Sequence, residues 1–346
     1  MKKAFLIILI LLSMTISVQA MEFSPPDVPD SGAGFMPEEP DSFGEGLWFI
    51  FKQAVDEFLP QISHSAVSCL SVIAVLLLVS VLDQFSGASA KAVHLASSVM
   101  LGLILLNPAY SLISLGVSTV TEMSEYGKLL LPVLTGALAA QGGVTSSGAL
   151  YAIMSAFSAF LITLATKIIV PMLYIYFCLS LIIGAIDNEL IKNMQNFIKW
   201  LITWSLKITL YIFMGVVGVT GVVSGTADAS AVKAMKLTIS GMVPVVGGII
   251  SDASETILIS AGVMKGAAGI YGILAIIAIF VGPFLKIGCQ YLMLKATGAV
   301  CSVFSAKKES NMLKDISTGM GLLLAMTGTV CLVLLIGAVC FMRGVA

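Results

Sequence analysis

The feature that most constrains this chain is the length of its uninterrupted apolar runs. One run extends from Ala149 to Ile186 and another from Gly269 to Ala306. Each is close to twice the ~20 residues that a single membrane-spanning helix needs. The chain is 58% hydrophobic and 11% charged, whereas soluble domains contain about 45–50% apolar and ~25% charged residues. A water-soluble core cannot bury this much apolar surface, so the sequence predicts a protein that faces lipid.

The apolar runs predict an all-α fold, a polytopic transmembrane helical bundle of about 7–8 spans. Each of the two longest runs carries a lysine and a proline near its middle, Lys167 with Pro171 and Pro283 with Lys286. Proline interrupts the backbone hydrogen bonds of a helix, so we expect each of these runs to divide into two spans. The other expected spans are residues 67–82, 92–117, 200–223 and 318–341.

The N-terminal residues have the pattern of a secretory signal. Lysines precede a short apolar run that ends in small residues at Ala20, which predicts a signal peptide, either cleaved or kept as an anchor. Residues 21–45 are rich in carboxylates and proline and contain no lysine or arginine, which predicts a disordered segment on the extracytoplasmic side. The expected divisions are a signal peptide at 1–20, an acidic and amphipathic segment at 21–62, and a membrane domain at 63–346.

Lysine positions provide a test of orientation, because cytoplasmic loops carry an excess of Lys and Arg. If residues 21–66 lie outside, the loops 83–91, 224–241 and 306–316 lie inside. These three loops carry Lys91, Lys233, Lys236, Lys307, Lys308 and Lys314. The bias agrees with the orientation that the signal peptide predicts, although Lys128, Lys192 and Lys199 fall on the other side in this arrangement.

A weak internal repeat relates two parts of the membrane domain. A shift of 112 residues pairs Pro132 with Pro244 and Gly136 with Gly248, which would give repeat units 92–203 and 204–315. The matches are compatible with a true repeat and with chance in a biased composition. Paired Pro/Gly-broken segments are typical of inverted-repeat transporters, but four spans per unit would make the repeats parallel instead.

The stretch GMVPVVGGIISDASETILIS, residues 241–260, breaks its backbone and then places two carboxylates three residues apart. Pro244 and the Gly247-Gly248 pair predict that the preceding helix ends near 241–244. Asp252 and Glu255 then have the spacing of a capping box that starts a new helix. The alternative is that both carboxylates face water in a translocation path, since ionisable groups at membrane depth are commonly functional.

The first half has a similar break in AAQGGVTSSGAL, residues 139–150, with hydroxyl groups in place of the acids. These hydroxyls could line a polar path or serve as loop and cap residues. The candidate pore, gate or helix-break residues are Pro132, Gly136, Gly142, Gly143, Pro244, Gly247, Gly248, Asp252 and Glu255.

Catalysis has little support in the sequence. No H-E-x-x-H, Walker A or G-x-S-x-G motif occurs. The cysteines lie in apolar runs without C-x-x-C spacing, as expected of small buried hydrophobes rather than of a disulfide or metal framework. The net charge of −1 and a single arginine, Arg343, disfavour nucleic-acid binding. We therefore expect no enzyme activity, no cofactor, no metal and no nucleic-acid partner.

Two stretches carry a resemblance to a known family. They are VKAMKLTISGMVPVVGGIISDASETILISAGVMKGAAGIYG at 232–272 and LLPVLTGALAAQGGVTSSG at 130–148. Both resemble the stage III sporulation protein AE family of endospore-forming bacteria, and the core P-V-V-G-G-x-x-S-D-A-x-E-T is too particular to arise from hydrophobicity alone. The resemblance extends over most of the chain after residue 46, whereas the acidic segment 21–45 has no match in it.

The resemblance implies a multi-pass protein of the mother-cell membrane that surrounds the engulfed forespore. Members of the family resemble permeases and belong to a channel-like complex that joins the two cells, needed for forespore integrity and late gene expression. The partners implied are the other stage III sporulation A-operon proteins, namely a secretion-type ATPase and ring-forming single-span proteins, and a forespore-side receptor. Besides these, only membrane lipids are expected as partners. The resemblance supplies no catalytic residues.

Overall fold

The computed structural model describes residues 26–37, 42–86, 90–141, 143–186, 188–242, 247–303 and 307–343. All regular structure in these ranges is helical, which confirms the all-α prediction. The helices are α2 (Asp30–Ala33), α3 (Phe43–Ser86), α4 (Ala90–Ala140), α5 (Val144–Thr163), the π-helical segment η2 (Leu164–Ile169), α6 (Val170–Ala185), α7 (Glu189–Met242), α8 (Gly247–Val303) and α9 (Lys307–Arg343).

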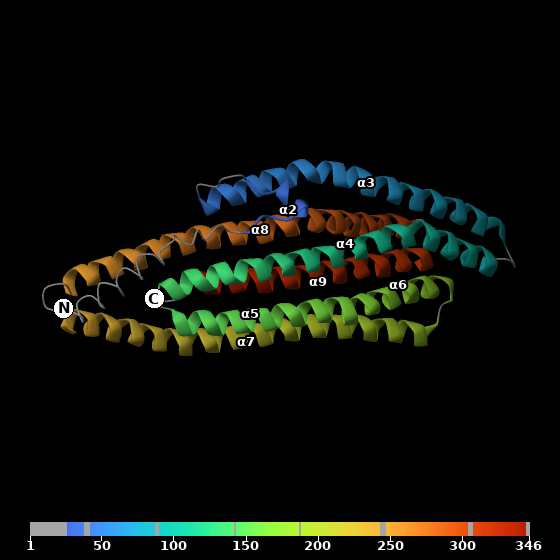
Figure 1. Ribbon diagram of the computed structural model, residues 1–346. Helices are drawn as coiled ribbons and strands as arrows, with labels where there is room; N and C mark the ends of the chain where they lie inside the picture. The colour runs from blue at the N-terminus through green and yellow to red at the C-terminus, as the bar shows by residue number, and fades with distance from the viewer. Residues whose placement is uncertain are drawn as a thin grey trace.

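The long helices lie side by side as an elongated bundle (Figure 1). α5, η2 and α6 follow one another without a gap and form a single rod. Successive rods run in opposite directions, so the α3–α4, α6–α7 and α8–α9 connections lie at one end, on the right in Figure 1. The α4–α5 and α7–α8 connections lie at the other end, and the α7–α8 hairpin extends beyond α4 and α5 there.

The described residues contain six helical stretches long and apolar enough to cross a membrane, so the expected division of the two longest runs is wrong. The chain is a multi-pass membrane protein, and its described residues hold fewer candidate spans than the 7–8 predicted. The six stretches are Phe43–Val79, Leu95–Ala140, Val144–Ala185, Glu189–Gly218, Gly266–Ser302 and Glu309–Met342.

Both prolines that were expected to divide a run lie inside continuous rods. Pro171 follows the π-helical segment directly and occupies the first turn of α6. A π turn accommodates the missing N–H and the bulk of the proline ring. Pro283 lies within α8 itself, where packing by neighbouring helices makes a lost hydrogen bond tolerable at membrane depth.

The rods are longer than a bilayer is thick. The stretches Val144–Ala185 and Gly266–Ser302 contain 42 and 37 residues, which corresponds to about 63 and 55 Å at 1.5 Å per residue. The hydrocarbon core of a bilayer is only about 30 Å thick, and tilts of about 20° shorten a helix little. The ends of the bundle must therefore project out of the hydrocarbon region.

The six-span arrangement corrects the predicted distribution of lysines. Lys192 and Lys199 lie in the first turns of α7, at the same end as the α3–α4 and α8–α9 connections. Lys233 and Lys236 lie near the end of α7, so they are at the opposite end of the bundle and not beside Lys91 as predicted. The end on the right in Figure 1, hereafter the basic end, carries Lys91, Lys192, Lys199, Lys295, Lys307, Lys308 and Lys314. By the positive-inside rule this distribution predicts that the basic end faces the cytoplasm, although Lys128, Lys233, Lys236, Lys265 and Arg343 lie toward the opposite end.

Small residues allow the helices to pack closely around α9, which contacts α4, α5, α6, α7 and α8. A Cβ atom added at Gly319 would lie 2.6 Å from the ring of Phe177 in α6. A Cβ at Gly116 of α4 would lie equally close, at 2.6 Å, to the side chain of Leu323. Such close approach at glycine is how transmembrane helices gain van der Waals contact in lipid.

Four cysteines follow the expectation of small buried hydrophobes, namely Cys69, Cys289, Cys301 and Cys331. Cys340 is partly buried and Cys178 is exposed on the outer face of α6. All six thiols are free, so no disulfide contributes to the fold.

The acidic N-terminal segment was predicted to be disordered, and this is wrong for residues 26–37. Within this range Asp30–Ala33 forms α2, which packs against α8 and contains the buried Gly32. The predicted signal peptide at 1–20 lies outside the described residues.

We expect Gly319→Ala to lower the free energy of unfolding by about 1–3 kcal/mol, because overpacking against a rigid ring forces the helices apart. Gly328→Ala, on the same helix, is the matched control, since nothing lies within 4 Å of its added Cβ. The measurement is thermal unfolding of the two purified variants in one detergent. Equal melting temperatures for the two variants would contradict the packing of α6 on α9.

Candidate functional site

A polar cavity of about 230 Å³ lies between α2, α3, α4 and α8. Its polar lining consists of Glu57 and Gln61 from α3, Lys286 from α8 and Ser31 from α2. The cavity thus brings a carboxylate and an ammonium group from two different rods to one place. Ionisable residues in membrane helices are costly and usually line a path or a binding site.

Pro283 lines the same cavity and explains why it forms at this level of α8. A proline cannot donate the backbone hydrogen bond that would otherwise reach the carbonyl of Ile279. The α-helical hydrogen bond to this carbonyl is therefore missing two turns before Lys286. Irregular backbone at membrane depth is tolerated where it is buried in protein or lines a water-filled cavity.

Aromatic residues that are exposed or partly buried indicate how deep this cavity lies. Tyr and Trp gather at the two membrane–water interfaces. Tyr271 and Tyr291 of α8 are separated by about 30 Å along the helix. Tyr151 and Tyr174, on the α5–α6 rod, are separated by about 34 Å. Both separations match the ~30 Å hydrocarbon core of a bilayer.

The aromatic residues nearer the basic end lie at a common level on several rods. The rings of Tyr110 and Tyr174 have centroids 6.2 Å apart. Trp200 and Trp204 of α7 are both exposed and stack with centroids 5.9 Å apart. Exposed Tyr211 of α7 is an exception, since it lies between the two aromatic levels.

With these levels as boundaries, the cavity lies near the middle of the membrane. Pro283 is about 18 Å from Tyr271 and about 12 Å from Tyr291 along α8. Glu122, next to the cavity, is about 18 Å from Tyr110 along α4. Two of the residues that line it, Glu57 and Lys286, are exposed at this level.

A second group of buried polar side chains holds the rods together near the basic end. The Ser97 hydroxyl donates a 3.0 Å hydrogen bond to buried Glu309, joining α4 to α9. The Ser310 hydroxyl donates to the carbonyl of Gly298 in α8 at 2.7 Å. The Gln195 amide donates to the Ser180 hydroxyl at 2.7 Å and joins α7 to α6. These bonds satisfy buried polar groups between helices, as a structural role requires.

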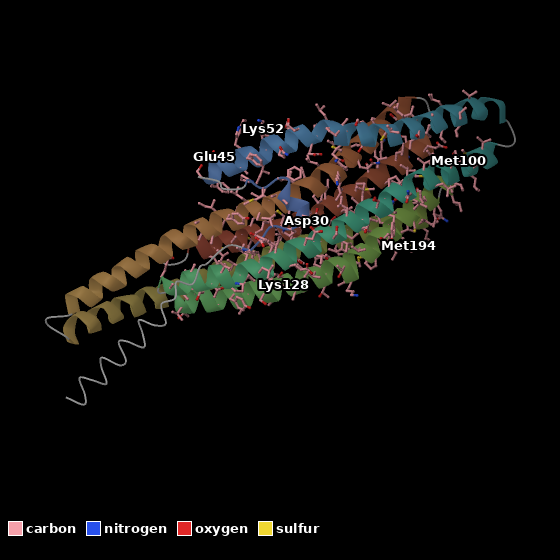
Figure 2. The ribbon with its side chains drawn as sticks, turned by 45° about the horizontal axis from the view of Figure 1, so that its top comes forward. Asp30, Glu45, Lys52, Met100, Lys128 and Met194 are labelled. Carbon is pink, nitrogen blue, oxygen red and sulfur yellow. The ribbon has the colours of Figure 1, made fainter. Side chains whose placement is uncertain are left out.

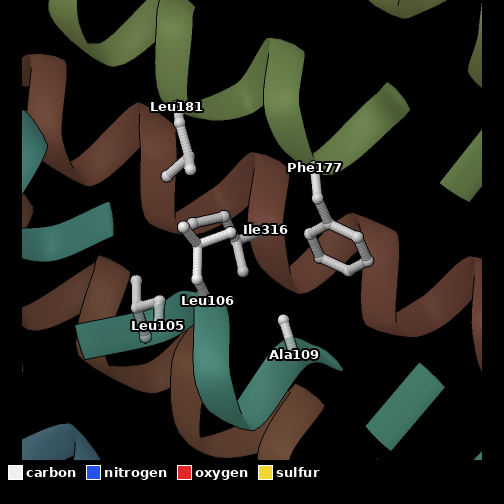
Figure 3. A pocket seen from close by; sticks show the side chains of 6 residues that line it. All are labelled: Leu105, Leu106, Ala109, Phe177, Leu181 and Ile316. Carbon is white, nitrogen blue, oxygen red and sulfur yellow. The ribbon is translucent and has the colours of Figure 1, made fainter. Parts of the chain in front are cut away.

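Apolar pockets lie between α4 and α6. Figure 3 shows one of them, with Leu106 and Leu181 pointing toward each other from the two helices. A larger one of about 300 Å³ shares both leucines and is lined almost entirely by apolar side chains. Such a surface suits lipid chains, so the polar cavity is the better candidate for a solute site.

The break in the first half of the chain lies where the sequence predicted it. α4 ends at Ala140 and α5 begins at Val144, with buried Gly143 at its N-cap position. Pro132 is exposed and Gly136 partly buried, both inside α4. Gly142 lies outside the described residues.

The second break is confirmed at its start and corrected at its end. α7 ends at Met242, as predicted, but α8 already begins at Gly247. Asp252 and Glu255 therefore lie inside α8 and form no capping box at its start. The error came from treating the Gly247-Gly248 pair as helix-breaking, although the first turn of a helix tolerates glycine. Pro244 and the side chains of residues 219–265 lie outside the described part of the chain.

Both breaks lie at the end of the bundle opposite the basic end (Figure 1), and not at the cavity. A pore role for Asp252 and Glu255 stays a prediction. The 112-residue repeat also stays a prediction, although Pro132 lies inside a helix while Pro244 follows the end of one.

The sequence singled out Pro283 and Lys286 as interruptions but missed Glu57 and Gln61. Their signal was two polar side chains one turn apart, next to Pro60.

The described residues include no group of three or more His, Cys, Asp or Glu side chains that could hold a metal ion. The cavity itself contributes one carboxylate, one amide, one ammonium and one hydroxyl group to its polar lining. This set suits hydrogen bonding to a hydrated solute rather than metal coordination, which needs several carboxylate or imidazole ligands.

The sequence model of stage III sporulation protein AE matches residues 42–344. The chain belongs to the stage III sporulation protein AE family. It is therefore a multi-pass membrane protein of a sporulation family, and the resemblance noted in the sequence is confirmed. It is also 22% identical over 202 residues to stage III sporulation protein AE of Bacillus subtilis (strain 168). That alignment covers 58% of this chain and 51% of the relative, so the chain spans about half the length of the curated relative it matches. No solved structure matches the chain.

The proposed membrane boundaries can be tested with a pair of nitroxide labels on α7. Ile212 and Met194 are similarly exposed, 52% and 50%, and Figure 2 shows Met194 near the basic end. A label at Ile212→Cys should be accessible to oxygen and protected from a water-soluble nickel reagent. A label at Met194→Cys, beyond the Trp200 level, should show the reverse. Equal accessibilities for the two labels would contradict the boundaries.

Proposed function

We propose that this chain is an integral membrane component of the channel complex that joins the mother cell to the engulfed forespore. On this proposal it lies in the mother-cell membrane around the forespore and is needed for forespore integrity and late gene expression. Its partners are the secretion-type ATPase, the ring-forming single-span proteins and the forespore-side receptor. Membership of the family and six candidate spans support this assignment.

The observation that carries a conducting role is the polar cavity at mid-membrane depth. Glu57 and Lys286 come from different rods and line one cavity beside Pro283. Glu57 and Lys286 are both exposed, and a charged side chain at this depth costs several kcal/mol unless it faces water, which a protein that only anchored its partners would not need. The proposed role is therefore a membrane gate or path within the complex, without enzymatic chemistry or a cofactor.

Two alternatives lead to different outcomes. A stand-alone secondary transporter would work without the ring-forming partners, whereas a channel component would fail without them. A membrane scaffold would tolerate neutral residues in the cavity and fail when helix packing is disturbed. The first observation needed is a gene deletion in the native host, followed by membrane-dye microscopy and a late forespore reporter. Arrest after engulfment with a silent reporter supports the channel proposal, and normal spores would remove it.

In the native host, Glu57→Gln and Lys286→Met should each block sporulation while protein levels stay normal. We expect the yield of heat-resistant spores to fall by about tenfold or more, the change that ~1.4 kcal/mol on a rate-limiting barrier produces. Glu45→Gln and Lys52→Met are matched controls, because both residues are exposed on α3 and absent from the cavity lining. Normal spore yields with both cavity variants would favour the scaffold over a conducting component.

A further inference from the structure

We propose that the segment 26–37, which contains α2, is a plug over the side of the polar cavity on which the partly buried Gln61 lies. α2 lies between α3 and α8, midway along the bundle (Figure 1), and Figure 2 shows Asp30 at the same place from another side. Ser31 and Phe35 of this segment form part of the cavity lining. The inference deepens the proposed function, since a plug matters only where the cavity conducts.

The segment is held by close contacts with the turn of α8 that precedes Pro283. A Cβ atom added at Gly32 would lie 2.9 Å from the backbone nitrogen and 2.9 Å from the side chain of Ile279. One turn further, the ring of Phe35 lies 3.2 Å from the Cβ position of Gly282. Two glycines, one on each partner, thus let the segment approach the backbone of α8.

A polar contact fixes the other side of the segment. The Ser31 hydroxyl donates a hydrogen bond to the carboxylate of Glu122 in α4. Glu122 is partly buried, so this bond satisfies a charged acceptor that would otherwise face hydrocarbon or an open path. Hydrogen bonds to charged groups are stronger than neutral ones, contributing about 1.5–3 kcal/mol.

The described residues contain no disulfide, so noncovalent contacts hold the segment against the rods. α2 has only four residues, and helices this short have no stability of their own. Its position therefore depends on contacts that a conformational change in α8 or α4 can break. When the segment leaves, Ser31 and Phe35 are lost from the cavity wall and the partly buried Gln61 becomes exposed, as Glu57 and Lys286 already are.

The class of cargo follows from the lining left behind. With one carboxylate, one amide and one ammonium group, the open path would favour small hydrated solutes and water over apolar molecules. A cavity of about 230 Å³ admits solutes of amino-acid size, and a folded protein is far too large for it.

Substitution of Gly32 tests the plug without altering the charged groups of the cavity. Gly32→Leu forces the segment away from α8. One of the two atoms nearest to the new Cβ is the backbone nitrogen of Ile279, which cannot move aside as a flexible side chain can. Gly34→Leu is the matched control, since nothing lies within 4 Å of its Cβ. Both are combined with Gln61→Cys in the full-length protein, reconstituted in liposomes, and labelled with a water-soluble maleimide. In a parallel sample that keeps Gln61, the maleimide labels only the native cysteines. That background rate is subtracted from the rate measured with Gln61→Cys.

We expect Gly32→Leu to speed labelling at position 61 by about tenfold or more relative to Gly34→Leu, because it makes a minor open state the major one. Equal labelling rates for the two variants would overturn the plug. Release of a small trapped zwitterion from the same liposomes separates the plug from the proposed function. Faster labelling together with faster release supports both, while faster labelling without release supports the plug and counts against conduction by this chain alone.

Discussion

The constraint on which the rest of this structure depends is that a backbone in lipid must satisfy its own hydrogen bonds. Continuous helices meet this requirement, and the described chain consists almost entirely of them. The rods even pass through Pro171 and Pro283 without separating into shorter helices. Where a hydrogen bond is lost inside α8, the structure places a polar cavity and a covering segment. The candidate site is thus a local consequence of the rule that shapes the whole fold.

The same environment determines how the rods associate. Apolar side chains gain little from leaving lipid for a protein interior, so close contact and buried hydrogen bonds must hold the bundle together. Glycines supply the close contact, as at Gly319 against Phe177. The hydroxyls and amides near the basic end supply the bonds, as between Ser97 and Glu309. The lysines of that end predict that it faces the cytoplasm.

The sequence was sufficient for the fold class, the helix break at 141–143 and the end of α7. These depend on local signals, namely apolar run length, glycine pairs and proline. The number of spans was overestimated because proline was taken as a boundary, whereas a π turn before Pro171 and packing around Pro283 keep the helices continuous. The cavity could not be predicted, because Glu57 and Lys286 come to line it only through the packing of α3 on α8. The order of residues 26–37 likewise depends on a tertiary contact with α8.

The central claim is that Glu57 and Lys286 act together in one cavity at the middle of the membrane. Charge exchange tests it most directly, by measuring spore yield in the native host for Glu57→Lys, Lys286→Glu and the two combined. Each single reversal places two like charges in one cavity and should block sporulation. The double variant restores one charge of each sign, so it should recover spore yield well above either single variant. Full activity of both single variants, or a double variant no better than the worse of them, would contradict the account.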